Sequence, residues 1–284
     1  MSPRLPMTLS AKALLFDMDG TLVDSTAAVE GKLRYKPTVI CPFADIARKN
    51  RRLGNIRRTL SAPRHSKHLK NFTWYAHPVK HTLERKKTHI IPAGVRSVDN
   101  MRRHVLPPGT PEPECEAEAD RFEIEIVASA KHAKDTGKNG IIYLPGTEDI
   151  LAVARAARAP APRHAAWAIC TSATPIYAAS ALATVGIPVP TAFVTARDVA
   201  HGKPSPDPYI QGAQKCNVDP KDCVVFEDAP SGIRSGKAAG CKVIALLTSH
   251  SREAVEAAEP DIIVEDLSHV VASWDGDLFT LQIV

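Results

Sequence analysis

The sequence lacks the features that mark membrane-spanning, secreted and zinc-finger proteins. No stretch of its 284 residues reaches the roughly 18 consecutive apolar residues of a membrane-spanning helix, and residues 1–10 contain no apolar segment of the secretory type. The six cysteines are scattered and form no CxxC pair, so neither a disulfide framework nor a zinc site is indicated. We therefore expect a protein of the reducing cytoplasm that does not associate with membranes.

Acidic side chains are scarce in one part of the chain. Residues 31–89 contain 16 Lys or Arg but 2 Asp or Glu, whereas the other 225 residues contain 20 basic and 29 acidic side chains. The formal net charge of +5 therefore describes neither part. Because the basic segment shows neither strand nor helix periodicity and is interrupted by prolines, we expect its charges to be solvated.

The C-terminal part of the chain alternates between short apolar runs and helical patterns. Such alternation predicts an α/β fold built on a doubly wound parallel sheet. Ligands of these sheets bind beyond the carboxyl ends of the strands, which indicates where to look for chemistry. Strands are expected at 166–170, 192–195, 223–226, 242–247 and 262–264, and helices at 175–185, 208–216 with Asp207 as N-cap, 231–239 and 252–258.

The preceding residues add one strand and three helices to this prediction. Residues 13–16 form an apolar run that is typical of a buried parallel strand. A short helix is expected at 95–105. Apolar residues four apart predict a longer helix over 114–134, and Thr147 is suited to cap a third helix that runs to about residue 158.

Asp17 and Asp19 follow the first predicted strand, and Gly20 after them would permit a tight turn. Two carboxylates at one strand end can point toward the same ligand, where one can attack as a nucleophile while the other moves a proton. An acidic surface turn is the alternative interpretation of this pair.

A further strand end and a loop carry groups suited to a phosphate. Thr171 and Ser172 offer hydroxyl and backbone N–H groups at the start of a helix, although taken alone they are more typical of simple helix capping. Lys203 lies in a proline-rich loop that would fix its ammonium group, which could neutralise a phosphoryl group and an attacking carboxylate. The alternative for Lys203 is a solvated side chain on a rigid loop.

Glu227 and Asp228 follow the strand predicted at 223–226 and supply a second acidic pair. Four neighbouring carboxylates would repel one another, so a metal cation or the ammonium group of Lys203 is required among them. Carboxylate oxygens are the ligands that Mg²⁺ prefers, together with water and phosphate. The sequence therefore predicts a magnesium site at this edge of the sheet.

These residues together match a known family. The stretch LLFDMDGTLVDS at 14–25 closely resembles the first motif of the haloacid dehalogenase superfamily, and Thr171, Lys203 and the Glu227–Asp228 pair match its later motifs in order. The stretches WAICTS at 167–172, GKPSPDPY at 202–209 and VVFEDAPSGI at 224–233 resemble fungal glycerol-3-phosphate and 2-deoxyglucose-6-phosphate phosphatases. The resemblance covers residues 12–30 and about 90–270.

The resemblance implies a role for each matching residue. Asp17 would be the nucleophile that forms an aspartyl-phosphate, and Asp19 would protonate the leaving group and then activate water. Thr171, Ser172 and Lys203 would bind the phosphoryl oxygens. Mg²⁺ would be held by Asp17, the backbone carbonyl of Asp19, and Asp228, with Glu227 close by. Arg96, in the region of the cap, could contact the substrate. The alternative interpretation is that Arg96 is an ordinary charged residue on the surface of a helix.

The resemblance also implies a domain organisation. Residues 1–27 and 160–284 would form the catalytic core, and residues 28–159 a helical cap inserted after the first strand. The basic segment 31–89 interrupts this cap, and the family pattern resumes after it at Gly94. We interpret residues 31 to about 91 as translated non-coding sequence, such as a retained intron. The rival is a basic arm that binds nucleic acid or an acidic membrane, for which no accompanying RNA-binding motif is present.

The expected function is a Mg²⁺-dependent phosphatase that hydrolyses a small phosphorylated polyol or sugar through an aspartyl-phosphate. A sugar phosphomutase of the same superfamily and an inactive product with a disrupted cap remain as alternatives. The expected ligand is a small phosphorylated metabolite, with no specific nucleic-acid or membrane partner, and the expected state is a monomer. Neither the individual substrate nor the oligomeric state follows from these motifs.

Overall fold

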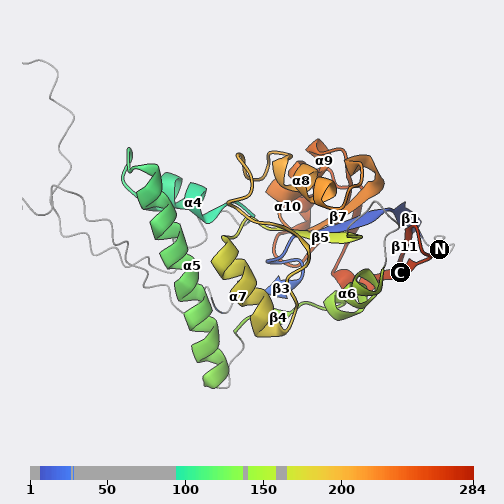
Figure 1. The fold of residues 1–284 in the computed structure, drawn as a ribbon, viewed down its shortest axis with the longest axis horizontal. Helices are drawn as coiled ribbons and strands as arrows, with labels where there is room; N and C mark the ends of the chain where they lie inside the picture. The colour runs from blue at the N-terminus through green and yellow to red at the C-terminus, as the bar shows by residue number, and fades with distance from the viewer. Residues whose placement is uncertain (1–6, 27, 29–93, 137–139, 158–164) are drawn as a thin grey trace, which may run out of the picture.

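The computed structural model describes residues 7–26, 28, 94–136, 140–157 and 165–284 (Figure 1). Its centre is a six-stranded sheet in the order β6-β5-β2-β7-β8-β9, in which every neighbouring pair is parallel. The strands are short and mostly buried, as expected for a sheet that is covered on both faces. They are β2 (Ala13–Phe16), β5 (Trp167–Cys170), β6 (Ala192–Val194), β7 (Cys223–Glu227), β8 (Lys242–Leu246) and β9 (Ile262–Val264).

Helices cover both faces of this sheet, which confirms the doubly wound fold predicted from the sequence. Leu14 and Phe16 of β2 pack on one face with α6 (Thr147–Ala156) and α7 (Pro175–Val185). The intervening side chains Ala13 and Leu15 pack on the other face, because successive residues of a strand point in opposite directions. That face is covered by α8 (Asp207–Lys215), α9 (Pro230–Ala238) and α10 (Arg252–Glu256) (Figure 1).

The cap helices lie at one side of the sheet, where α5 (Glu112–Asp135) packs against α7 (Figure 1). The predicted apolar stripe of α5 faces inward, since Ile126 and Ala130 are buried in the main core and Phe122 packs against it. A short helix α4 (Ser97–Asn100) continues into a π-helical turn at Met101–Val105. Together they confirm the helix predicted over 95–105. The basic segment 31–89 lies outside the described residues.

Two residues that the sequence predicts as N-caps lie inside their helices. Gly146 and Pro206 are the N-caps of α6 and α8, so Thr147 and Asp207 are the first helical residues. The hydroxyl of Thr147 donates to the carbonyl oxygen of Leu22, 3.0 Å away, and does not cap its own helix. Thr147 was predicted as a cap from its local propensity, but its hydroxyl instead makes a tertiary contact with a residue far away in the sequence.

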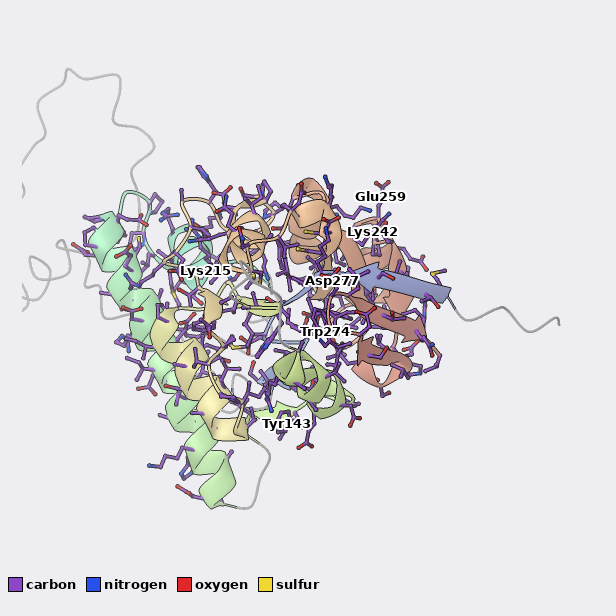
Figure 2. All side chains as sticks on the ribbon, turned by 45° about the vertical axis from the view of Figure 1, so that its right-hand side comes forward. Tyr143, Lys215, Lys242, Glu259, Trp274 and Asp277 are labelled. Atoms are coloured by element: carbon purple, nitrogen blue, oxygen red, sulfur yellow. The ribbon has the colours of Figure 1, made fainter. Side chains whose placement is uncertain are left out.

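The sequence analysis also missed two small antiparallel pairings. β1 (Met7–Ala11), β11 (Phe279–Ile283) and β10 (Val270–Trp274) form a three-stranded sheet, at one end of which lies Trp274 (Figure 2). The ring centroids of Trp274 and Phe279 are 4.5 Å apart. β3 (Val23–Asp24) pairs with β4 (Ile142–Tyr143). Helix α6 packs against β10 and the main core. The proposed division of the chain into core and cap domains stays a prediction.

The described part of the chain bears on two features that the sequence was expected to lack, disulfide bonds and membrane-spanning helices. Its five cysteines are free and buried, whereas Cys41 lies outside the described residues. No described helix combines the length and the apolar character that crossing a bilayer requires.

Candidate active site

The predicted site residues meet at the carboxyl edge of the central sheet. Asp17 follows β2, Thr171 follows β5, and Glu227 ends β7, three strands that are neighbours in the sheet. Lys203 reaches the same place from the loop between β6 and α8. All four side chains are buried, and so is Asp228, the residue after Glu227.

Lys203 holds two of the carboxylates together. Its ammonium group contacts Oδ1 of Asp17 and donates to Oε1 of Glu227 at 2.7 Å. It also lies 5.0 Å from the ring centroid of Tyr209, whose hydroxyl donates to the same Oε1 at 2.9 Å. Burial alone would lower the pKa of Lys203, but the two carboxylates outweigh it and raise the pKa above its ordinary value, so the side chain stays charged.

The cluster contains more negative charge than Lys203 neutralises. One carboxylate oxygen from each of Asp17, Glu227 and Asp228 lies within 4.8 Å of the other two. Burial, and then the charge of Glu227, raise the pKa of Asp228 to about 7. Burial also raises the pKa of Asp17 well above its usual range, although Lys203 opposes this effect. A further cation would keep these groups ionised, so the donor set fits a hard divalent metal such as Mg²⁺.

The surroundings hold Asp228 in one orientation. Thr21 donates to its Oδ1 at 3.0 Å, and Ser249 donates to its Oδ2. Gly20 has a φ of +86°, and a Cβ there would lie 2.2 Å from Oδ2 of Asp228, so the position requires glycine for both its conformation and its space. The sequence analysis did not identify Ser249, although it lies just beyond β8, where the rule on strand ends could have found it.

Glu227 is held by its own backbone. Its Oε2 accepts hydrogen bonds from the backbone N–H groups of Asp228 and Ala229, each at 2.9 Å. Its other oxygen accepts from Lys203 and Tyr209. Glu227 therefore positions Lys203 beside Asp17 with both of its oxygens already engaged.

Asp19 lies beside this cluster with its side chain turned toward helix α7. Its Oδ1 accepts hydrogen bonds from the hydroxyls of Ser25 and Tyr177, each at 2.7 Å. Burial raises the pKa of Asp19, and these two hydrogen bonds oppose the rise. The side chain is not one of the three clustered carboxylates, so the metal role expected for Asp19, through its backbone carbonyl, stays a prediction.

Thr171 and Ser172 directly follow β5. The buried hydroxyl of Thr171 accepts from the backbone N–H of Ala173 at 3.1 Å. Ser172 donates to the carbonyl oxygen of Gly94 at 3.0 Å. Ser172 therefore contacts the cap, and the roles of both residues in phosphate binding remain predictions.

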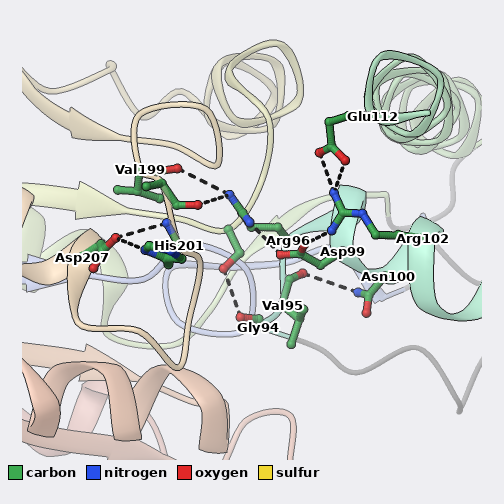
Figure 3. A network of polar contacts seen from close by, with 12 residues as sticks. Gly94, Val95, Arg96, Asp99, Asn100, Arg102, Glu112, Val199, His201 and Asp207 are labelled. Atoms are coloured by element: carbon green, nitrogen blue, oxygen red, sulfur yellow. Dashed lines mark hydrogen bonds and ion pairs between the residues drawn. The ribbon is translucent and has the colours of Figure 1, made fainter. Parts of the chain in front are cut away.

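Arg96 lies beside the loop that carries Lys203 and is engaged by protein groups. Its Nε donates to Asp99 at 2.7 Å, and its Nη1 lies 3.4 Å from the carbonyl oxygens of Val199 and Ala200 (Figure 3). The same side chain packs against Gly202. Substrate contact by Arg96 stays a prediction.

The cap contacts the core at three further points, none of which the sequence analysis identified. Gly94, with a φ of +74°, approaches the loop after Asp228 so closely that a Cβ would lie 2.6 Å from that of Ala229. Arg197, in the loop after β6, donates to two acidic side chains of α5 at 3.1 and 2.7 Å. The third point is Glu123 of α5, which accepts from the Ser97 hydroxyl at 2.5 Å and from the backbone N–H of Thr174 at 3.0 Å.

Glu123 should make the stability of the protein depend on pH. Burial raises its pKa from 4.5 to about 6, against the opposing effect of its hydrogen bonds with Ser97 and Thr174. The folded state therefore binds this proton more tightly than the unfolded chain does, and the free energy of unfolding falls as pH rises through that window. Between these pH values the free energy of unfolding of wild type should fall by about 2 kcal/mol because of Glu123, since one pKa unit corresponds to about 1.4 kcal/mol. We expect Glu123→Gln to lose this part of the pH dependence.

Urea unfolding of wild type and Glu123→Gln at pH 4.5 and pH 7 measures this difference. Glu114→Gln, at an exposed position on the same helix, is the matched control and should follow wild type. An identical pH dependence in wild type and Glu123→Gln would contradict the prediction.

Comparison with known proteins gives consistent matches. A family profile described as "Hydrolase: haloacid dehalogenase-like hydrolase" matches residues 11–240. Hexitol phosphatase A of Escherichia coli (strain K12) is 30% identical over 265 residues, covering 93% of this chain and 95% of that protein. Glycerol-1-phosphate phosphohydrolase 2 of Saccharomyces cerevisiae is 42% identical over 107 residues, covering 35% of this chain and 43% of the yeast protein.

The solved structures are similar in fold at low sequence identity. The β-phosphoglucomutase of Clostridium difficile superimposes with a TM-score of 0.58 at 17% identity, covering 91% of this chain and 92% of that chain. At this identity the likeness shows the fold alone.

Proposed function

This chain belongs to the haloacid dehalogenase-like hydrolase family, and from that premise we propose that it is a phosphatase acting on small phosphorylated sugars or polyols. The observation that carries the proposal is the contact of Asp17 with Lys203 inside a buried cluster of three carboxylates, with a fourth carboxylate, Asp19, beside it. Two similar proteins are named for the phosphatase reaction, one on hexitol phosphates and one on glycerol 1-phosphate.

In the proposed reaction, Asp17 attacks the phosphorus atom of the substrate and an aspartyl-phosphate forms. The bond between phosphorus and the ester oxygen breaks, and Asp19 gives a proton to the leaving alkoxide. Water then attacks the phosphoenzyme, returns a proton to Asp19 and releases phosphate from Asp17. Lys203, which already contacts Asp17, and the groups at Thr171 and Ser172 would bind the phosphoryl oxygens.

Mg²⁺ is the cofactor that we propose for this site. Asp17 and Asp228 would hold it together with the backbone carbonyl of Asp19, while Glu227 is engaged by Lys203. The ion would supply positive charge that keeps the carboxylates ionised and offsets the charge on the phosphoryl group. The remaining catalysis is positioning by the chain's own residues.

Mg²⁺ should stabilise the folded protein even without substrate, because a ligand that binds the folded state alone raises the unfolding temperature. We expect Mg²⁺ to raise the melting temperature of wild type, and EDTA to reverse this increase. Asp228→Asn should lose most of the increase, since the amide supplies no charge to the ion. Asp149→Asn, an exposed position on α6, is the matched control. Equal Mg²⁺ shifts in wild type and Asp228→Asn would remove Asp228 from the proposed ligands.

A phosphomutase would need the cap to hold a second phosphate group. Arg96 is the cap cation predicted to contact substrate, and it is bound to Asp99 and to backbone carbonyls of the Lys203 loop. The names of the two similar proteins, both phosphatases, favour the phosphatase over the mutase. A small phosphorylated metabolite as ligand, a monomeric state and a cytoplasmic location complete the proposal.

A phosphate-release screen tests the proposal. The full chain, with and without Mg²⁺, is incubated with glycerol 3-phosphate, 2-deoxyglucose 6-phosphate, hexitol phosphates and β-glucose 1-phosphate. We expect inorganic phosphate from at least one polyol or sugar phosphate. Conversion of β-glucose 1-phosphate to the 6-phosphate without phosphate release would favour the mutase. A folded protein that releases no phosphate from any of them would favour the inactive product.

A further inference from the structure

Tyr177 is a buried tyrosine whose hydroxyl points at the proposed proton donor. It is the third residue of α7, and its ring is 4% exposed within the main apolar core. The hydroxyl donates to Oδ1 of Asp19 at 2.7 Å. None of the family motifs quoted above includes this position.

We propose that Tyr177 is a positioning residue that selects which oxygen of Asp19 exchanges the proton with the leaving group. This inference rests on the proposed phosphatase function, in which Asp19 is the general acid. Because the ring is enclosed by the core, the hydroxyl cannot follow Asp19 if that side chain rotates.

The two oxygens of the Asp19 carboxylate differ in their hydrogen bonds. Ser25 and Tyr177 both donate to Oδ1. Within the described part of the chain, no hydrogen-bond donor reaches Oδ2. Because two hydroxyls already engage Oδ1, Oδ2 is the oxygen that remains available to exchange a proton with the substrate. Oδ2 is then the atom that gives its proton to the alkoxide and later accepts one from water.

The two donors come from different parts of the molecule. Ser25 follows β3, at the start of the chain segment that leads into the cap, whereas Tyr177 belongs to a helix of the core. Loss of the Tyr177 hydroxyl would leave the carboxylate held by Ser25 alone. The carboxyl group could then turn about its terminal torsion, which is broad and roughly two-fold for aspartate.

The consequence depends on the leaving group of the substrate. An alkoxide is a poor leaving group and needs the proton of Asp19 as the phosphorus–oxygen bond breaks. The p-nitrophenolate ion leaves without that proton. The ratio kcat/KM covers the steps up to formation of the phosphoenzyme, so a defect in proton donation should lower kcat/KM for an alkyl phosphate and spare it for p-nitrophenyl phosphate.

The test compares Tyr177→Phe with wild type on p-nitrophenyl phosphate and on the alkyl phosphate that wild type hydrolyses best. We expect kcat/KM to fall about 10-fold or more for the alkyl phosphate, a part of the 10²- to 10⁴-fold that general acids typically contribute. For p-nitrophenyl phosphate we expect a change of less than about 2-fold. Tyr143→Phe, at a half-buried tyrosine of β4 (Figure 2), is the matched control and should leave both values unchanged.

Ser25→Ala provides a second variant at a half-buried position, and it removes the other donor to the same oxygen. It should show the same selective loss on the alkyl phosphate, which keeps the inference testable if Tyr177→Phe folds poorly. Equal losses on both substrates, or no loss on either, would overturn the role of Tyr177 and leave the phosphatase function standing. A wild-type protein that is inactive on both substrates would overturn the proposed function itself, and the inference with it.

Discussion

Replacing Asp17 by asparagine should lower the rate of phosphate release by about 10⁴-fold or more, because an amide cannot attack phosphorus to form the phosphoenzyme. The substitution keeps the size of the side chain and changes its charge. Asp17 is the carboxylate that Lys203 contacts, and it lies in the three-carboxylate cluster. Steady-state phosphate release on the best substrate measures the effect.

The same substitution should leave the fold intact, which separates chemistry from stability. Burial raises the pKa of Asp17, so the ionised carboxylate is costly in the folded state, and removing its charge should not lower the free energy of unfolding. Asp24→Asn is the matched control, since Asp24 lies in β3 outside the cluster. Undiminished phosphate release by a folded Asp17→Asn protein would remove Asp17 from the mechanism.

Replacing Lys203 by methionine should damage both stability and activity. The side chain is fully enclosed between Asp17 and Glu227. Its loss would leave two buried carboxylates facing each other without their cation, which typically costs about 3–5 kcal/mol of unfolding free energy. Loss of the positive charge beside the phosphoryl group should also lower turnover by about 10²- to 10³-fold, comparable to losing one oxyanion donor.

The destabilisation of Lys203→Met should grow as the pH rises. Without Lys203 the pKa values of the buried carboxylates rise further, so the folded state holds protons that the unfolded chain has lost, and the free energy of unfolding falls with increasing pH. Urea unfolding at pH 5 and pH 8, in the absence of Mg²⁺, measures this trend. Lys215→Met on α8 (Figure 2) is the matched control. A variant as stable as wild type at pH 8 would contradict the charge balance described for the cluster.

The main chemical groups of the site could be predicted because they follow buried parallel strands. Such strands appear in the sequence as short apolar runs, and their carboxyl ends must meet at one edge of the sheet. Asp17 and Glu227 follow this rule directly. Lys203 was suggested by its stiff loop and by family resemblance, and the structure places it in contact with both carboxylates.

The residues that orient these groups could not be predicted in the same way. Tyr177 and Glu123 are buried polar residues of helices, and their importance arises from partners far away in the sequence. The three-stranded sheet of β1, β11 and β10 was missed for another reason. Its strands bury one face only, so they carry no continuous apolar run of the kind that marked the central strands.

The loop between β6 and α8 serves the cap and the phosphate site at once. Arg197 of this loop binds α5, the carbonyl oxygens of Val199 and Ala200 receive Arg96 of the cap, and Lys203 contacts Asp17. Because one loop makes all of these contacts, we expect a substitution that moves its contacts with α5 or Arg96 also to move the ammonium group of Lys203 relative to Asp17. Substrate preference and turnover would then change together.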